Sequence, residues 1–171
     1  MRKSVLLLFL MFAVSVTANA QQYAFIDTEY ILGKIPAYEL ANKQLNELSQ
    51  KWQNEIEAAS QEAQKIYKDY QAQYASLTDE QRTKKEEEVI AKEKGIGELR
   101  RQYFGPEGEL AKRQQALIQP IQDDIYEAVK VIAERRGYAT VIDRASASSI
   151  IFASPRIDIS NEVLAELGYS N

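Results

Sequence analysis

The sequence predicts a mostly helical α+β protein, in which a long antiparallel helical hairpin, a coiled-coil-like arm, projects from a small three-stranded β base. The hairpin is predicted by the stretch Pro36–Gly137, where apolar residues recur at helical spacing among good helix formers. Short apolar runs before and after that stretch are typical of strands and predict the base. A leg of about 40 residues spans roughly 60 Å, longer than a small domain is wide, so the hairpin is expected to project.

Residues 1–20 are expected to be a secretory signal peptide and not part of the fold. Arg2 and Lys3 form a charged start, Val5–Val16 is an apolar run, and Ala18–Ala20 fits a small-residue cleavage site. An uncleaved membrane anchor is the alternative, but the apolar run is short for a bilayer. No later stretch is long and apolar enough to cross a membrane, so the mature protein is expected to be exported and soluble.

The base is expected to comprise residues 21–36 and 137–171, the second segment ending in a short helix. Its first segment opens with an apolar strand, Tyr23–Asp27. A helical turn over Glu29–Leu32 follows, for which Thr28 is the expected cap.

Residues 37–136 are expected to form the arm, with its tip near 77–88. Pro36 suits the first turn of the outgoing helix. Thr78–Gln81 has the form of a capping box, so the chain is expected to turn at 77–78. The apolar face of the outgoing helix has a mean step of about 3.6 residues, that of a straight α-helix. Its members are Ala41, Leu45, Leu48, Trp52, Ile56, Ala59, Ala63, Ile66, Tyr70, Tyr74 and Leu77.

The return helix is expected to be less regular and to give the arm its flexibility. Gly95 and Gly97 each weaken a helix by roughly 1 kcal/mol. Gly105, Pro106 and Gly108 are expected to break it. Splaying is therefore predicted at these glycines, and a further bend at the proline at position 120.

Gly137 is expected to end the return helix in a left-handed cap. Ala139–Asp143 and Ser149–Ala153 follow as the second and third strands, and residues 161–167 as the last helix. The strands are nearly continuous apolar runs, the pattern of strands buried on both faces. One short helix cannot cover such a sheet, so we expect copies of the chain to complete the base. The expected oligomerisation core is Phe25, Ile26, Val141, Ile142, Ile150, Ile151 and Phe152.

The composition argues against an enzyme. The chain has no His and no Cys, which removes the commonest general base, thiol nucleophile and transition-metal ligands. We expect no catalytic residue, no cofactor and no metal site. Asp27, Asp143 and Asp158 could hold a hard cation, but turn and cap chemistry is the favoured interpretation. Without Arg2 and Lys3 the chain carries 19 basic and 25 acidic residues, which argues against nucleic acid as a partner.

A group of aromatic residues in the outer half of the arm is the candidate contact surface for unfolded chains. Tyr70 and Tyr74 lie on the apolar face, so filling the seam between the helices is the alternative for them. Tyr67 lies one step off that face and is expected to be more exposed. Tyr103 and Phe104 lie across the hairpin. Exposed tyrosines contact varied apolar segments at little cost in side-chain ordering.

The order of these parts resembles the Skp/OmpH-like family of periplasmic chaperones, and the C-terminal part is the more specific. The resemblance is carried by Phe25-Ile26-Asp27, Ile35-Pro36, the charged hairpin, Pro120-Ile121-Gln122, Ala128–Ala133, Gly137-Tyr138, Val141-Ile142-Asp143, Ile151-Phe152 and Ile157–Leu164. It implies a periplasmic homotrimer whose strands form a small barrel, with three arms around a cavity that holds unfolded outer-membrane proteins without ATP. Better-known members have strongly basic arms suited to lipopolysaccharide. Here the arm, Glu39 to Arg136, has 19 acidic and 16 basic residues, so no lipopolysaccharide site is carried over.

The favoured function is therefore a periplasmic holdase for unfolded outer-membrane proteins. The alternative is a structural coiled-coil spacer or scaffold of the cell envelope, with the apolar face used entirely inside the hairpin. An enzyme would need a carboxylate-only site at the base.

Overall fold

The structure, a computed structural model, describes residues 22–147 and 149–169. The chain divides into two compact units. We call Ile35–Asp123 the hairpin unit, and the described parts of Met1–Lys34 and Asp124–Asn171 the strand unit. The predicted signal peptide, residues 1–20, lies outside the described residues.

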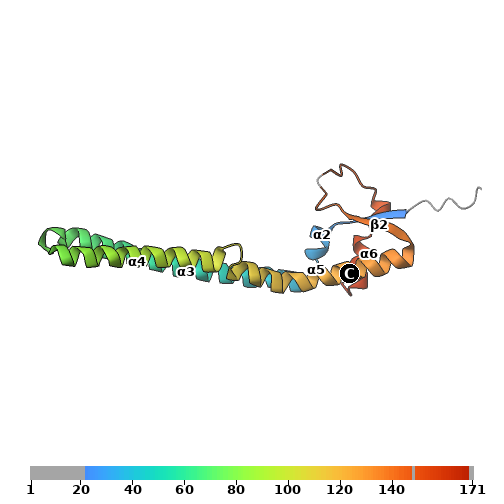
Figure 1. Ribbon diagram of the computed structural model, residues 1–171. Helices are drawn as coiled ribbons and strands as arrows, with labels where there is room; N and C mark the ends of the chain where they lie inside the picture. Colours follow the sequence, from blue (N-terminus) through green and yellow to red (C-terminus); the bar gives the residue numbers. More distant parts are fainter. Residues whose placement is uncertain (1–21, 148, 170–171) are drawn as a thin grey trace, which may run out of the picture. The chain divides into compact units, whose positions relative to one another are not determined.

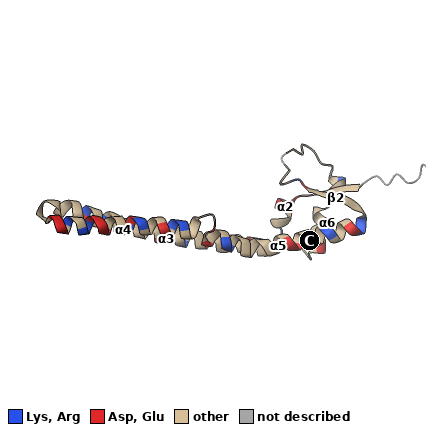
Figure 2. Cartoon of the chain, viewed as in Figure 1, with Lys and Arg blue, Asp and Glu red and all other residues tan. Residues whose placement is uncertain are grey.

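Two long helices, α3 (Pro36–Gln73) and α4 (Asp79–Phe104), lie side by side and antiparallel in the hairpin unit (Figure 1). The short 3₁₀ turn η2 (Tyr74–Ser76) joins them. The protein is thus mostly helical with a long helical hairpin, as the sequence predicts. Lysine, arginine and acidic residues are interspersed along both helices (Figure 2).

The helix boundaries follow from local chemistry. Pro36 occupies the first turn of α3, where its missing N–H costs nothing. The Thr78 hydroxyl accepts a hydrogen bond from the Gln81 N–H at 3.3 Å, and the Gln81 side chain accepts one from the Thr78 N–H at 2.9 Å. This capping box confirms the predicted turn at 77–78.

The seam of the hairpin follows the predicted apolar face of α3. Ala41, Ile56, Ala63 and Tyr70 are buried, and all four belong to that face. Tyr74 belongs to it too but is 49% exposed, because α3 ends one residue before it.

The return leg divides where glycine and proline predict it to. α4 ends at Phe104 and α5 (Glu109–Arg136) begins after the break at residues 105–108. Gly95 and Gly97 do not interrupt α4. α5 continues through Pro120, which therefore does not end the helix. Gly137 follows α5 with a φ of +74°, the predicted left-handed cap.

The strand unit contains one parallel pair of strands. Its elements are β1 (Gln22–Ile26), α2 (Thr28–Leu32), the C-terminal part of α5, β2 (Tyr138–Asp143), the 3₁₀ turn η3 (Pro155–Ile157) and α6 (Ser160–Glu166). β1 pairs with β2 so that Phe25 lies opposite Ile142. On its other edge, Phe25 forms an isolated bridge with Asp158 and accepts a hydrogen bond from the Ile159 N–H at 2.8 Å.

Among the described residues, the large side chains that are fully buried lie in the strand unit. Ile31 of α2, Ile132 of α5 and Val163 of α6 are inaccessible to solvent, and Ile159 is 2% exposed. Ala24, Phe25 and Ile26 of β1 are buried as well. A single chain therefore has a small core of its own in this unit.

Two local predictions are corrected by the structure. Residues 149–153, predicted to be the third strand, form no strand in this chain, since no neighbouring backbone among the described residues pairs with them. The cap of α2 is Asp27, whose carboxylate accepts a hydrogen bond from the Tyr30 N–H at 2.9 Å. Thr28 is the first residue of α2 and donates its hydroxyl to Asp143 at 2.8 Å.

The three aspartates of the base serve turns and caps, which confirms the favoured interpretation. Asp143 accepts hydrogen bonds from the N–H groups of Thr28 and Ala145, each at 3.1 Å. Asp158 accepts from the Ser160 N–H at 2.9 Å. The Arg144 guanidinium lies 3.0 Å from Asp27 and 3.5 Å from Asp158 and forms an ion pair with each.

The Asp143 carboxylate should make the strand unit sensitive to acid. Burial raises its pKa, but the hydrogen bonds from Thr28 and Ala145 outweigh burial and hold the pKa below the ordinary value of 3.8. A depressed folded-state pKa contributes stability above the unfolded-state pKa, and that stability is lost as pH falls through the folded value. Asp143→Asn should lower the free energy of unfolding by about 1–3 kcal/mol at pH 7 and flatten its decline toward pH 3.

Urea denaturation between pH 7 and pH 3 measures this effect. Asp124→Asn, an exposed carboxylate on α5, is the matched control and should leave the profile unchanged. Parallel profiles for Asp143→Asn and the wild-type protein would contradict the assignment.

Candidate functional site

The two predicted contact residues near the tip, Tyr70 and Tyr74, interact with side chains of α4 in the same hairpin. The Tyr70 hydroxyl donates to Glu86 across the seam at 2.5 Å, and this hydrogen bond with burial raises the pKa of Tyr70 to about 12. The guanidinium of Arg82 lies 4.4 Å from the centre of the Tyr74 ring, and its Nε donates to the Tyr74 carbonyl at 3.1 Å. Tyr70 is thus buried in the seam, whereas Tyr74 is 49% exposed and packs against Arg82 at the turn.

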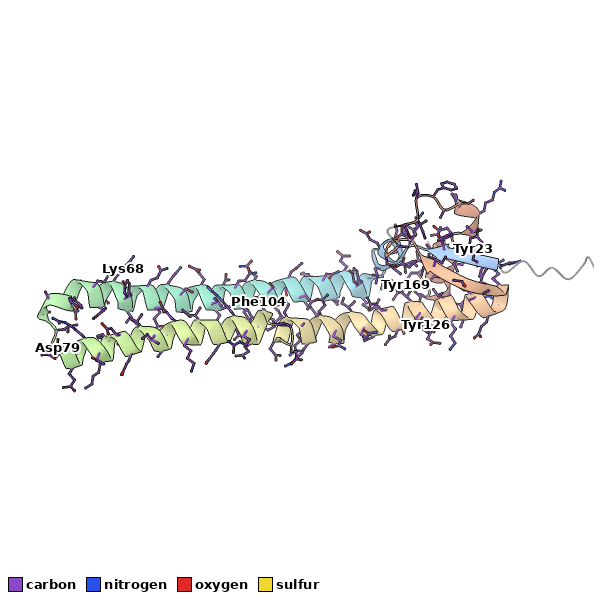
Figure 3. The ribbon with its side chains drawn as sticks, turned by 45° about the horizontal axis from the view of Figure 1, so that its top comes forward. Tyr23, Lys68, Asp79, Phe104, Tyr126 and Tyr169 are labelled. Carbon is purple, nitrogen blue, oxygen red and sulfur yellow. The ribbon has the colours of Figure 1, made fainter. Side chains whose placement is uncertain are left out.

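A second aromatic cluster lies beside the break between α4 and α5. Trp52 stacks on Tyr103 with ring centres 4.9 Å apart and meets Phe104 edge-on at 6.3 Å. The Tyr103 hydroxyl donates to Glu55 at 3.0 Å, which raises the pKa of Tyr103. Phe104, labelled in Figure 3, remains 37% exposed. Trp52 belongs to the predicted apolar face of the outgoing helix, but its contact with Tyr103 was not predicted.

Tyr67 is the predicted contact residue that is least engaged by the hairpin. Its side chain is 47% exposed, as its position off the apolar face predicts. It lines an open groove together with Ala63 of α3 and Ile96 of α4. Tyr74 is exposed too, but the Arg82 guanidinium lies over its ring. Of the five candidate residues, Tyr67 and Phe104 thus offer the most accessible aromatic surface.

The predicted oligomerisation residues fall into two groups. Phe25 and Ile26 are buried within the chain, and Val141, Ile142 and Ile150 are half-buried. By contrast, Ile151 is 100% exposed and Phe152 is 80% exposed. Large apolar side chains in that state are characteristic of an interaction surface.

The predicted flexibility residues also differ among themselves. A Cβ added at Gly97 would meet nothing within 4 Å, so Gly97→Ala should raise the free energy of unfolding by about 1 kcal/mol through helix propensity. A Cβ at Gly108 would lie 2.9 Å from the backbone atoms Gln102 O, Gly105 N and Tyr103 O, so Gly108→Ala should lower it by about 1–3 kcal/mol.

Thermal unfolding of these two variants measures the difference. Gly97→Ala and Gly108→Ala change the same atoms on the same leg of the hairpin, so each is the other's control. A Gly108→Ala midpoint at or above that of the wild-type protein would show that the 105–108 break does not depend on close backbone approach.

In residues 22–147 and 149–169, no group of three or more acidic side chains could hold a metal ion. In the same residues, no helix has both the length and the apolar content that crossing a membrane requires.

Comparison with known proteins places this architecture among relatives. The family model described as "Outer membrane protein (OmpH-like)" matches residues 22–167. The chain is 28% identical over 155 residues to the chaperone protein Skp of Yersinia enterocolitica, covering 91% of each chain. It is 25% identical over 158 residues to that of Photorhabdus luminescens, covering 91% and 92%. A solved OmpH-like structure from Caulobacter crescentus matches with a TM-score of 0.68 at 13% identity, over 85% of this chain and 82% of that one, and shows the same fold.

Proposed function

The chain belongs to the OmpH-like family, and we propose that it is a periplasmic holdase chaperone that binds unfolded outer-membrane proteins without ATP and prevents their aggregation. Relatives that match over nine-tenths of their length carry the name chaperone. The observation that carries the proposal is the hairpin, whose mixed charges surround accessible aromatic side chains at Tyr67 and Phe104. Such a surface offers many weak contacts, which suits clients of varied sequence.

We further propose that copies of the chain assemble through the base, residues 21–36 and 137–171, and that residues 37–136 act as arms. Three copies are expected from the family resemblance. The exposed Ile151 and Phe152 support the assembly, since residues 149–153 have no strand partner in the described part of the chain and a second copy could supply one. Arms around a shared cavity would raise the effective concentration of each weak contact.

Aggregation of an unfolded outer-membrane β-barrel protein, followed by light scattering after dilution from urea, tests the function. The wild-type protein should suppress scattering at about one assembly per client, equally with and without ATP. Unchanged scattering at that ratio would refute the proposal.

A structural spacer of the envelope is the second candidate, favoured by the seam residues that the hairpin uses internally, such as Trp52 and Tyr70. Replacing Tyr67 and Phe104 with serine separates the two functions. A holdase should lose protective capacity, whereas a spacer should be unaffected because its length is unchanged.

A further inference from the structure

Two open grooves flank the middle of the hairpin, where the facing residues are small. One, of about 380 Å³, lies beside Ala59, Ala91 and Gly95. The other, of about 310 Å³, lies beside Ala63 and Tyr67. Ile96 of α4 lines both. Alanine and glycine cannot fill the space between two helices, so the seam is left incompletely packed on each side of Ile96.

The polar rims of the two grooves differ. In the larger groove, Lys92 is engaged by Glu62 at 2.7 Å. In the smaller groove, neither Glu93 nor Arg100 has a hydrogen-bond or ion-pair partner among the described residues. One free acceptor and one free donor therefore border an apolar floor. We call this smaller groove the Tyr67 groove.

We propose that the Tyr67 groove binds a short extended segment of unfolded polypeptide. One apolar side chain of the segment packs against Ala63, Tyr67 and Ile96. Glu93 accepts a hydrogen bond from a backbone N–H of the segment, and Arg100 donates one to a backbone carbonyl. This inference rests on the proposed function. It adds where on the hairpin a client binds and that the bound segment of the client is extended.

The spacing of the rim residues fits an extended backbone. Glu93 and Arg100 are two helical turns apart on α4, about 10 Å along the helix axis. An extended chain advances about 3.3 Å per residue, so roughly three residues join the two charged groups, with the middle side chain over Ile96. Alternate side chains of such a segment point to opposite sides, so every second residue can face the groove. Strands of membrane β-barrels alternate apolar and polar residues in this way.

Photocrosslinking with a defined peptide tests the site. The probe is an acetylated nine-residue peptide of alternating serine and valine, with benzoylphenylalanine at the central apolar position. It is irradiated with the full mature protein, and the adducts are mapped by mass spectrometry. Adducts are expected on the residues of the Tyr67 groove, and a probe with polar residues at all other positions should give far fewer.

Matched substitutions sharpen the test. Tyr67→Ala should weaken peptide binding about tenfold by fluorescence anisotropy, because it removes an aromatic wall of the groove. Glu93→Ala with Arg100→Ala removes the acceptor and the donor. It should weaken binding less, and should abolish any preference for extended over cyclic peptides of the same composition. Ile90→Ala is the control, since Ile90 is 64% exposed on the same helix but lines neither groove. Its affinity should equal that of the wild-type protein.

The outcomes separate the site from the function. Adducts confined to residues that line only the larger groove, to Ile151–Phe152 or to a second copy of the chain overturn the Tyr67 groove. Equal loss of affinity in Tyr67→Ala and Ile90→Ala does so too. Suppression of client aggregation without any groove adduct overturns the site while the holdase function stands. Groove adducts in a protein that fails to suppress aggregation support a peptide site and refute the holdase function.

Discussion

Replacing both Ile151 and Phe152 with aspartate is expected to convert the proposed assembly into single chains and to abolish the proposed protection of clients. Burying each of these side chains in an assembly contributes about 1.5–3 kcal/mol per copy, and an unpaired carboxylate in the same place costs several kcal/mol more. The combined loss of association free energy is large enough to dissociate a small interface. Because both side chains are exposed in the single chain, at 100% and 80%, its own fold should survive.

Sedimentation equilibrium measures the mass, and circular dichroism checks that the helical content is kept. Ile90→Asp is the control, because Ile90 is similarly exposed but lies in the hairpin unit. It should leave the mass of the assembly unchanged. An Ile151→Asp, Phe152→Asp protein that retains the wild-type mass would show that this segment is not part of the interface.

The helix boundaries were predictable because each depends on residues close together in the sequence. Thr78 and Gln81 form the capping box within one turn, and Gly137 supplies its own left-handed conformation. The cap of α2 was assigned to Thr28 instead of Asp27, since either residue could cap a helix in that position. The competing use of Thr28, its hydrogen bond to Asp143, joins residues 115 positions apart and has no local signal.

The third strand illustrates a different limit. Apolar content predicts that residues 149–153 belong inside a protein, but a strand also needs a hydrogen-bonding neighbour. The described residues of the single chain do not supply such a neighbouring strand. The apolar pattern therefore predicts that the segment is buried, but not which strand it pairs with.

The pairing across the hairpin follows from the position of the turn. Tyr70 with Glu86, Glu62 with Lys92, and Glu55 with Tyr103 are each centred within two residues of Thr78. Counting outward from the capping box would therefore have placed Trp52 opposite Tyr103. Whether facing side chains fill the seam depends on their sizes, which is why the grooves at Ala59 and Ala63 needed the structure.

Trp52→Ala is expected to loosen the hairpin at one place and not along its whole length. Trp52 stacks on Tyr103 and contacts Phe104, directly before the 105–108 break, where no continuous helix supports the return leg. Truncating it removes both aromatic contacts and leaves a cavity, at a cost of about 2–4 kcal/mol. At the tip, the hydrogen bond from Tyr70 to Glu86 joins the two helices independently of Trp52, so the tip should not be destabilised.

Amide hydrogen exchange resolved by residue measures this difference. Protection should fall for about residues 99–110 and persist for residues 79–90, while Trp52→Phe, which keeps an aromatic ring against Tyr103, should lie close to the wild-type protein. An equal loss of protection at the tip would mean that the hairpin melts as one cooperative unit. A local loss would instead mean that the aromatic cluster and the tip stabilise the hairpin independently. The weakly packed Tyr67 groove between them could then open around a client without unfolding of either end.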